Sequence, residues 1–450
     1  MNALELLKQK EPDPSSLAFH QPGEIIWNFG ELFALTAAAQ TGLRKYGVKT
    51  GDTVLFADQI SVEMYASVLA MLGMGVTVML VEPFLPVKEI EKIIQKTKPK
   101  LFIASTLGKF WGARVSAIRK INHWCTARSL CSFTEKEPFR VESLNPTHPG
   151  IMTFTSGTTG TSKAVIRTHQ SLTEQNRVLY ESIGFSHYPG TDLTIFANLV
   201  FANIATGRGS VFIGPKWKYN SLLKVQTLPQ ELQPETLSCG PGFIRHLLKN
   251  EKLKLASLKS IHVGGAQTDC QIFQNAFQRW GNARFLHIYG SSEAEPVAVS
   301  DARQAVEKSL ARGYFQTLSV GGPIPHIESR IEITGEQQGL WVKGPHVGPH
   351  WHFMGDRILE DSQGWWYQGR SQQDPDNFIL EQSIYSSLQS SASFVHQGTI
   401  LVGEKLKANE AKIKSTFPQI KKIVETKIIR DRRHHARIDR VKSLKAGKIS

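Results

Sequence analysis

The segment spanning residues 151–165, IMTFTSGTTGTSKAV, combines glycines, hydroxyls and a positive charge in a way that could hold phosphate groups. Gly157 and Gly160 allow a tight turn in which backbone amides point at one ligand. The Thr and Ser hydroxyls around them add hydrogen-bond donors, and Lys163 adds an ammonium group. These are the donors that phosphate oxygens accept. The pattern therefore predicts a phosphate-binding loop after a buried strand, made by Thr155, Ser156, Gly157, Thr158, Thr159, Gly160 and Lys163.

Two familiar nucleotide patterns do not describe this loop. Lys163 lies three residues after Gly160 rather than next to it, so the segment is not a GxxxxGK[ST] loop. A GxGxxG fingerprint is also missing from the segment. A surface loop rich in Ser, Thr and Gly would have a similar composition. The concentration of hydroxyls with a lysine directly after an apolar run favours phosphate binding over that alternative.

The loop resembles that of the adenylate-forming superfamily, which comprises acyl-CoA synthetases, fatty acyl-AMP ligases, peptide-synthetase adenylation domains and luciferases. The superfamily sequence is approximately TSGTTGxPKGV, and this chain has TSGTTGTSKAV, with Ser162 in place of Pro and Ala164 in place of Gly. Further segments resemble superfamily motifs in the same order along residues 25–370: GGA (264–266), YGSSE (289–293), SVGGPIP (319–325), GLWVKGPHV (339–347), MGD (354–356) and GWWYQGR (364–370).

Some details resemble one branch, the β-lactone synthetases of bacterial olefin biosynthesis. The stretches YGSSEAEPVA, FMGD and RHHARIDR are similar to YGATEALPVA, RMGD and RHNAKI in that branch. The segment FANLVFANIATG (196–207) lies where the superfamily builds its acyl pocket. Its apolar residues suit a fatty chain, and core packing explains them equally well.

The resemblance implies an ATP site, with one role for each matched residue. The loop would hold the β- and γ-phosphates, and Tyr289 would stack on adenine. Glu293 would bind Mg²⁺, because a hard cation prefers carboxylate oxygens. Asp356 would accept hydrogen bonds from both ribose hydroxyls, and Arg370 would support the ribose. The remaining implied nucleotide contacts are Gly264, Gly265 and Ala266 beside adenine, Gly290 in the YGSSE turn, and Ser292 at the α-phosphate.

The C-terminal part departs from the superfamily pattern. The superfamily places a lysine near the α-phosphate, and Arg437 occupies the matching position, so the resemblance implies a catalytic role for Arg437 beside Lys163 and Glu293. Arginine keeps the charge, but its planar fork differs from a compact ammonium. Asp374 is the acidic residue that matches the superfamily hinge.

The implied activity is ATP-dependent activation of a carboxylic acid, a fatty or β-hydroxy fatty acid, with release of pyrophosphate. Two second steps remain open: transfer to coenzyme A, or closure to a β-lactone by the β-hydroxyl of the substrate. The altered hinge, Ser162 and Arg437 are compatible with a third hypothesis, a non-catalytic nucleotide-binding regulator that kept the fold.

The elements that must position these residues follow an α/β pattern. Helical spacing over 29–46 precedes the strand TVLFA, a helix over 61–72 and the strand VTVMLV. An amphipathic helix over 87–97 leads into KLFIAS. This alternation predicts mostly parallel sheets with helices on both faces. Beyond Ser329, four short segments separated by glycine-containing turns predict antiparallel strands: SRIEIT, GLWVKG, DRILED and GWWYQG.

We therefore predict a large N-terminal domain of parallel sheets flanked by helices, with a small β subdomain, over residues 1–370. The polar stretch SQQDPDN supports a hinge at 371–376, and a small, basic C-terminal α/β lobe would follow at 377–450.

Composition narrows the class of protein. The chain has 450 residues, of which 41% are hydrophobic and 20% charged, as in globular proteins. Its four cysteines are too few and too scattered for a disulfide scaffold or a cysteine zinc site, and a cytoplasmic location is expected. The uncharged stretch from 64 to 81 contains Gly73 and Gly75, which favours a helix, a turn and a buried strand over a membrane span.

The net charge is +14, and residues 401–450 contain 15 basic and 5 acidic residues. Such a tail suits a polyphosphate substrate or an anionic membrane surface. Phe417 is the single aromatic residue in the tail that could stack on a base, so no nucleic-acid partner is expected. The expected partners are a small carboxylic acid and ATP with Mg²⁺; peripheral membrane contact stays open, and the sequence does not indicate an oligomeric state.

Overall fold

A computed structural model gives the fold. It describes residues 1–81, 85–134, 138–156, 162–214, 216–291, 293–312, 318–334, 337–371, 377–378, 380–381, 384, 393–396, 399–402, 414–426, 428 and 440–448. The chain divides into two compact units, Met1–Pro234 and Glu235–Ser450. The domain boundaries expected at 370 and 376 stay predictions.

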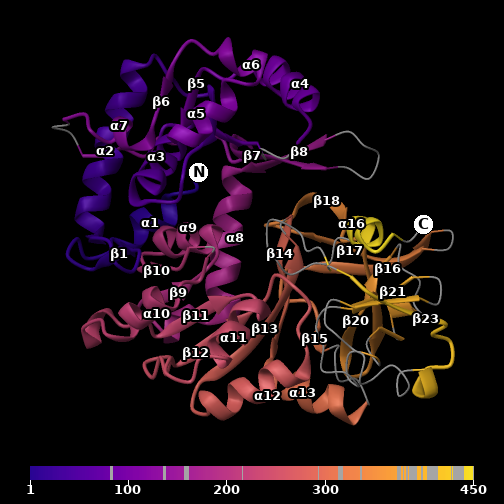
Figure 1. The fold of residues 1–450 in the computed structure, drawn as a ribbon. Coiled ribbons are helices and arrows are strands. Elements are labelled where there is room, and N and C mark those ends of the chain that lie inside the picture. Colours follow the sequence, from indigo (N-terminus) through magenta and orange to yellow (C-terminus); the bar gives the residue numbers. More distant parts are fainter. Residues whose placement is uncertain are drawn as a thin grey trace. The chain divides into compact units, whose positions relative to one another are not determined.

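Unit 1 contains a sheet with the strand order β6-β5-β3-β4-β7-β8 among its described residues (Figure 1). Its strands are parallel except β8, which pairs antiparallel with β7. The strands are β3 (Thr53–Ala57), β4 (Thr77–Leu80), β5 (Leu101–Ala104), β6 (Trp124–Cys125), β7 (Pro149–Ser156) and β8 (Ser162–Thr168). A second set pairs in the order β2-β1-β10-β9: β1 (Leu17–His20), β2 (Ile26–Asn28), β9 (Asp192–Thr194) and β10 (Ser210–Phe212).

The helices of unit 1 connect these strands as the βαβ pattern predicts. They are α1 (Glu5–Lys10), α2 (Phe29–Lys45), α3 (Val62–Gly73), α4 (Val87–Thr97), α5 (Thr106–Gly112), α6 (Ser116–Arg119), α7 (Ala127–Leu130), α8 (His169–Ile183), α9 (Ala197–Ala205) and α10 (Tyr219–Gln226), with short 3₁₀ turns η1 (Phe185–His187) and η2 (Gln230–Leu232).

Local chemistry explains where the predicted helices begin. The side chain of Asn28 accepts a hydrogen bond from the amide of Glu31, and the Glu31 carboxylate accepts one from the amide of Asn28, which makes a capping box for α2. Ser61 caps α3 in the same sense by accepting from the amide of Met64. The predicted helices over 29–46, 61–72 and 87–97 are thus confirmed, to within a residue at their ends.

The uncharged stretch from 64 to 81 is confirmed as helix α3, a turn and strand β4. Val76 and Val78 are buried, and β4 lies between β3 and β7 in the parallel sheet. Both faces of such a strand are covered, which explains its unbroken apolar sequence. No helix in the described ranges is long and apolar enough to cross a membrane.

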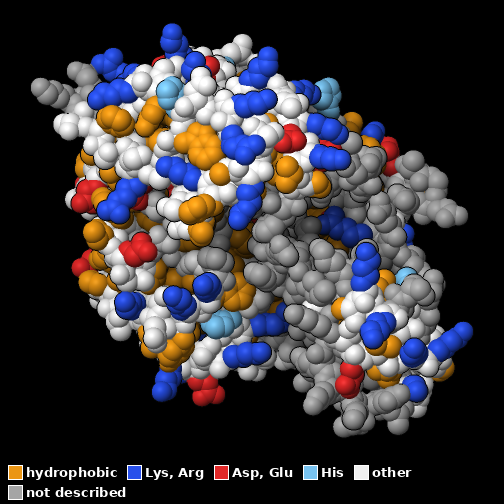
Figure 2. All heavy atoms as spheres, turned by 45° about the horizontal axis from the view of Figure 1, so that its top comes forward, with side chains coloured by type: hydrophobic (Ala, Val, Ile, Leu, Met, Phe, Trp, Pro, Cys, Tyr) orange, Lys and Arg blue, Asp and Glu red, His pale blue; other side chains and the backbone are white. Residues whose placement is uncertain are grey.

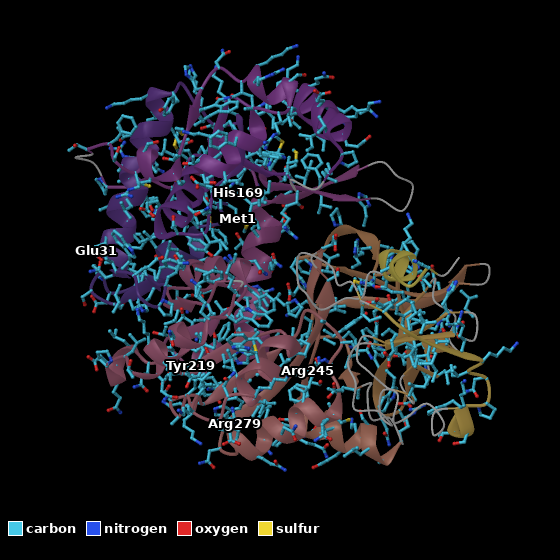
Figure 3. The ribbon with its side chains drawn as sticks, viewed as in Figure 1. Met1, Glu31, His169, Tyr219, Arg245 and Arg279 are labelled. Atoms are coloured by element: carbon cyan, nitrogen blue, oxygen red, sulfur yellow. The ribbon has the colours of Figure 1, made fainter. Side chains whose placement is uncertain are left out.

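The start of the chain packs inside unit 1. Ala3 and Leu4 are buried, and the amide of Ala3 donates to Nδ1 of His169 at 3.0 Å, at the first turn of α8. Figure 3 shows His169 next to Met1. The pKa of His169 is lowered to about 4, mainly by burial and to a smaller extent by the nearby His148 and the N-terminal ammonium. The neutral imidazole is therefore the form that the fold accommodates.

Unit 2 begins with a parallel series, β11-β12-β13, to which β14 adds antiparallel. Its elements up to residue 311 are β11 (Thr236–Cys239), α11 (Pro241–Leu248), β12 (Ser260–Val263), α12 (Cys270–Arg279), β13 (Arg284–Ser291), β14 (Ala294–Asp301) and α13 (Ala302–Ala311). The peptide bond between Glu295 and Pro296, in β14, is cis.

Short antiparallel sheets follow, as predicted for the region beyond Ser329. One has the order β15-β20-β19 and the other β16-β17-β18. Their strands are β15 (Ser319–Gly321), β16 (Glu328–Thr334), β17 (Gln337–Gly344), β18 (Gly348–Phe353), β19 (Asp356–Asp361) and β20 (Gly364–Arg370). The described residues beyond 371 include a sheet β21-β22-β23, with β21 (Ser393–His396), β22 (Thr399–Val402) and β23 (Lys422–Glu425), and the helix α16 (Arg440–Ala446).

The fold class is confirmed: parallel sheets flanked by helices, with a smaller antiparallel β region. All four cysteines are free and buried. Burial raises the pKa of the thiols of Cys125, Cys131 and Cys270 to about 12, so these side chains are neutral parts of the core.

Candidate functional site

Three of the predicted site residues meet in unit 2, around the carboxylate of Asp356. The hydroxyl of Tyr289 donates a hydrogen bond to Asp356 Oδ2 at 2.8 Å. Arg370 Nη1 forms an ion pair with Asp356 Oδ1, also at 2.8 Å, and donates to the carbonyl of Met354 at 3.1 Å. Both carboxylate oxygens therefore have a partner on the protein. We call Tyr289, Asp356 and Arg370 the carboxylate cluster.

Strand pairing explains why two of these residues lie side by side. Asp356 is the first residue of β19 and Arg370 is the last of β20, and the two are opposite partners in the antiparallel ladder. The short connection between the strands thus brings a carboxylate and a guanidinium together although 14 positions separate them. Directly opposite residues of opposite charge stabilise such a pair.

Tyr289 reaches the cluster from β13. Its ring belongs to a core that also includes Ala294, Val297, Leu340 and Met354, which fixes the direction of the phenol. The ring lies 6.4 Å from that of Tyr367, and the hydroxyl of Ser291 is 3.8 Å from Sδ of Met354. The ring of Tyr367 lies next to the rings of both Tyr289 and Phe378. The aromatic run GWWYQGR is the sequence feature that could have indicated Tyr367 as a site residue. Sequence reasoning did not assign Tyr367 to the site.

Within the cluster, Asp356 and Tyr289 are shielded from water, while the Arg370 side chain is partly exposed. Asp356 is 5% exposed and Tyr289 is 9% exposed. Burial raises the pKa of the Tyr289 phenol, and the negative charge of Asp356 raises it further, so the phenol keeps its proton. Burial acts to lower the pKa of Arg370, but Asp356, Tyr367, Tyr289 and Glu293 together outweigh burial, so the pKa is raised. The contribution of Glu293 places its carboxylate within electrostatic range of Arg370.

An ionised carboxylate is an acceptor with about four lone-pair sites. Tyr289 contacts one oxygen of Asp356 and Arg370 contacts the other. Vicinal hydroxyls of a sugar are donors, which match an acceptor of this kind. The geometry suits the role that the resemblance implies for Asp356.

Gly355, directly before Asp356, is required by the backbone. Its φ is +68°, a left-handed conformation that residues with a side chain rarely adopt. The amide of Ser371 donates to its carbonyl at 3.0 Å, which ties the start of β19 to the end of β20. The glycine of the MGD motif thus sets the direction in which the chain enters the cluster.

The GGA segment forms the turn after β12. Gly264 is buried at this turn, and a Cβ added to it would lie 2.8 Å from the carbonyl oxygen of Ile288 in β13. A side chain would therefore push the turn away from the strand that carries Tyr289. The turn leads to Asp269, which caps α12 by accepting from the amide of Ile272 and pairs with Arg245 of α11 at 2.6 Å (Figure 3 labels Arg245). Gly265 is exposed and Ala266 partly exposed, so both are available to a ligand.

Glu293 lies in the turn between β13 and β14, and its side chain is partly exposed. Among the described residues, no group of three His, Cys, Asp or Glu side chains could hold a metal ion. A single carboxylate suits Mg²⁺ bound through phosphate oxygens and water, because Mg²⁺ usually keeps several waters and takes one or two carboxylates. Glu293 therefore fits the metal role that the resemblance implies.

The other predicted residues lie wholly or partly outside the described part of the chain. Residues 157–161 of the loop, Ser292, Asp374 and Arg437 are not described. The described backbone gives the frame of the loop: β7 ends at Ser156 and β8 begins at Ser162, and the pair Thr155–Lys163 lies in the antiparallel ladder of unit 1. The roles of all these residues stay predictions, as do those of Gly290 and of the glycine turn.

Comparison with known proteins gives a family and a fold. The AMP-binding enzyme family matches residues 7–350. A nonribosomal peptide synthetase of Fusarium vanettenii is 26% identical over 345 residues, which cover 73% of this chain and 6% of that protein. A probable CoA ligase of Humulus lupulus is 24% identical over 373 residues, covering 75% of this chain and 66% of that protein. The matched part thus spans less than two thirds of either relative.

A solved structure has a similar fold. The crystal structure of ATP-bound MatB from Rhodopseudomonas palustris has a TM-score of 0.78 at 18% sequence identity, and the match covers 99% of both chains. At this level of identity the likeness concerns the fold.

Proposed function

Because the chain belongs to the AMP-binding enzyme family, we propose that it activates a carboxylic acid with ATP, forming an acyl-adenylate and releasing pyrophosphate. The observation that carries the proposal is the carboxylate cluster. Three residues predicted from separate motifs to contact the nucleotide are in direct contact around one buried carboxylate. Core packing alone would not require a buried carboxylate at the junction of two strands, since burying a charge costs free energy unless it is paired.

The proposed reaction asks the protein for position and charge rather than for covalent chemistry. A carboxylate oxygen of the acid attacks the α-phosphorus, the bond between that phosphorus and the bridging oxygen to the β-phosphate breaks, and pyrophosphate leaves with the bond electrons. Asp356 holds the ribose, and Tyr289 fixes Asp356 in place while its ring faces the base. Holding both reactants in line removes much of the entropic cost of their encounter.

Charge is supplied around the phosphates. Lys163 and the hydroxyls of the loop bind the β- and γ-phosphates, and Glu293 holds Mg²⁺. When bound, Mg²⁺ offsets the negative charge that builds on the leaving pyrophosphate. Arg437 stabilises the α-phosphate in the proposed arrangement. A single positioned charge of this kind is commonly worth about 3 kcal/mol of transition-state stabilisation.

For the second step we propose transfer of the acyl group to one of two nucleophiles. In one, the thiol of coenzyme A attacks the acyl carbon, AMP leaves, and a thioester forms. In the other, the β-hydroxyl of the bound acid attacks the same carbon, AMP leaves, and a four-membered lactone forms. The resemblance of YGSSEAEPVA and RHHARIDR to the β-lactone synthetases supports the second. Intramolecular attack needs no second substrate site.

A fatty or β-hydroxy fatty acid is the proposed substrate. The segment 196–207 forms helix α9 and its approaches, and Val200, Phe201 and Ile204 pack into the core of unit 1. Their contribution to the core explains their apolar character, so support for the acyl chain comes from the resemblance.

Exchange of labelled pyrophosphate into ATP tests the first step. We expect exchange that depends on the acid, falls by about a hundredfold in Glu293→Gln, and is unchanged in a control such as Glu251→Gln on an exposed turn. Nucleotide binding without exchange for any acid of a chain-length series, with or without a β-hydroxyl, would contradict the proposal and favour the non-catalytic regulator.

Product analysis tests the second step. The protein is incubated with ATP, Mg²⁺ and a long-chain acid, with or without the β-hydroxyl and with or without coenzyme A. Lactone formed without coenzyme A supports closure by the β-hydroxyl. A thioester formed from the plain acid supports transfer to coenzyme A and excludes an obligatory lactone.

A further inference from the structure

Helix α5 in unit 1 presents two large apolar side chains to solvent. Leu107 is 71% exposed and Phe110 is 65% exposed, and they are three residues apart, on one side of the helix. The opposite side is fixed to the sheet. Trp111 packs 6.4 Å from Phe102 of β5, and Gly112 lies so close to that ring that an added Cβ would be 2.5 Å from it. The helix therefore cannot rotate to bury Leu107 and Phe110 without losing this packing.

Basic residues surround the two apolar side chains. The range 85–134 contains ten Lys or Arg and two acidic residues, Glu89 and Glu91. Both acids have partners: Glu89 pairs with Lys92 at 3.2 Å, and Glu91 accepts from the hydroxyl of Ser116 at 2.7 Å. This local excess of positive charge lies far in the sequence from the basic tail.

The basic side chains face outward because the inward faces of their helices are apolar. In α4, Ile90, Ile93 and Ile94 are buried in the core beside Ile118 of α6. Lys88, Lys92 and Lys96 recur every fourth position on the other side of α4, and all three are exposed. Arg114, Arg119 and Lys120, next to α5 and within or after α6, are exposed too.

These elements lie together on unit 1. Figure 1 shows α4, α5 and α6 as neighbours at the top of the view, and the hydrogen bond between Ser116 and Glu91 joins α6 to α4. Figure 2, which turns this part forward, shows Lys and Arg side chains around exposed hydrophobic ones, with few acidic side chains among them. We call the exposed residues of 86–98 and 106–120 the α4–α6 surface.

We propose that the α4–α6 surface docks the protein on an anionic lipid membrane, with Leu107 and Phe110 inserted among the lipids and the surrounding lysines and arginines on the headgroups. Charge complementarity selects this occupant. Exposed apolar side chains within a basic surface match a bilayer, which offers an apolar interior beneath a negative surface. The inference does not depend on the proposed reaction, and such docking would suit a substrate that resides in membranes.

Sedimentation of the full-length protein with lipid vesicles tests the proposal. We expect binding to phosphatidylcholine vesicles that contain phosphatidylglycerol, weak binding to vesicles of phosphatidylcholine alone, and weaker binding to both at high salt. Leu107→Ser and Phe110→Ser should each lower the partition coefficient by about tenfold, because each removes a side chain that would leave water. Lys92→Glu with Lys96→Glu should lower it by more than about twentyfold, given about fivefold for each basic charge lost.

Matched variants separate docking from general effects of charge and exposure. Ile25→Ser removes a side chain that is 67% exposed elsewhere in unit 1, and Lys216→Glu with Lys218→Glu reverses two exposed charges next to α10. Both should bind vesicles like the unaltered protein. All substituted positions are at the surface, so the thermal midpoint of each variant should stay within a few degrees.

The proposal is overturned by no preference for anionic vesicles, by equal losses in the matched variants, or by saturable binding to polyglutamate without vesicle binding. The last would assign the surface to an acidic protein. Self-association that disappears in Phe110→Ser, with vesicle binding unchanged, would assign the apolar pair to a second copy of the chain.

Discussion

The hydrogen bond from Tyr289 to Asp356 can be measured as a coupling energy in unfolding experiments. Tyr289→Phe removes the hydroxyl and keeps the ring, so the change is confined to the 2.8 Å bond. Both residues are less than a tenth exposed, and the acceptor carboxylate is paired with the Arg370 guanidinium. A hydrogen bond to a charged group stabilises a protein by about 1.5–3 kcal/mol. Because Tyr289 and Asp356 are buried, water does not compete for this bond. We expect Tyr289→Phe to lower the free energy of unfolding of unit 2 by about 2 kcal/mol.

Asp356→Asn removes the negative charge and leaves a neutral oxygen that can still accept from Tyr289. The ion pair with Arg370 is then lost, but the Arg370 side chain is 40% exposed, so water screens that contribution to about 1 kcal/mol or less. A neutral bond is roughly half as strong as a charged one. The double variant should therefore show a coupling energy between Tyr289 and Asp356 of about 1 kcal/mol.

Urea unfolding of the unaltered protein, the two single variants and the double variant gives this coupling energy. Hydrogen exchange of the 356–370 segment gives a local readout. Tyr65→Phe is the matched control, because Tyr65 is also buried but donates to a neutral carbonyl, that of Ala197, at 3.1 Å. Its effect should add to that of Asp356→Asn without coupling. If the coupling energy between Tyr289 and Asp356 is near zero, as expected for the Tyr65 control, the reasoning is refuted.

Three further perturbations have defined outcomes. Burial lowers the pKa of His169 and of His287 to about 4 in the folded protein, whereas an unfolded histidine binds a proton near pH 6.5. Each histidine should therefore lower the free energy of unfolding by about 1.4 kcal/mol per pH unit as pH falls from about 6.5 towards 4. A urea midpoint that does not change down to about pH 5 would contradict this expectation. Gly264→Ala should destabilise unit 2 by about 1–3 kcal/mol, because the new Cβ meets the backbone of Ile288. Thermal unfolding checks this prediction, with Gly281→Ala as the control, because the nearest atom to a Cβ added at Gly281 is 3.4 Å away. Arg370→Lys should weaken ATP binding by about tenfold in calorimetry, because the lysine side chain is shorter and its ammonium does not reach the position of Nη1, which contacts both Asp356 and the Met354 carbonyl. Unchanged affinity would remove Arg370 from the site.

The elements that the sequence predicted well are those with a clear period and a local stop signal. The helix α4 has the bounds predicted for it, because its apolar positions recur at helical spacing. Strands β16, β17, β19 and β20 were predicted as antiparallel from alternation between glycine turns. Strand β18, with the sequence GPHWHF, was not predicted, since Pro349 and two histidines obscure its alternation, and its pairing with β17 is what makes it a strand.

The contacts within the site were harder to predict from the sequence. The motifs singled out Tyr289, Asp356 and Arg370 separately, but 67 positions separate Tyr289 from Asp356, and no spacing rule joins them. The contact depends on the core that orients the Tyr289 ring and on the register of β19 against β20. The α4–α6 surface was hidden for a related reason: Leu107 and Phe110 are exposed because Trp111 and Gly112 fix the other side of α5, a property of packing rather than of composition.

The claim that the carboxylate cluster holds the ribose of a nucleotide has a direct test in calorimetry with ATP and 2′-deoxy-ATP. The account predicts that the unaltered protein binds 2′-deoxy-ATP about tenfold more weakly than ATP, because one hydrogen bond to Asp356 is lost. It also predicts that Asp356→Ala, shown by urea unfolding to be folded, binds ATP weakly and no longer distinguishes the two nucleotides. The same preference for ATP in both proteins would show that the hydroxyl is recognised elsewhere.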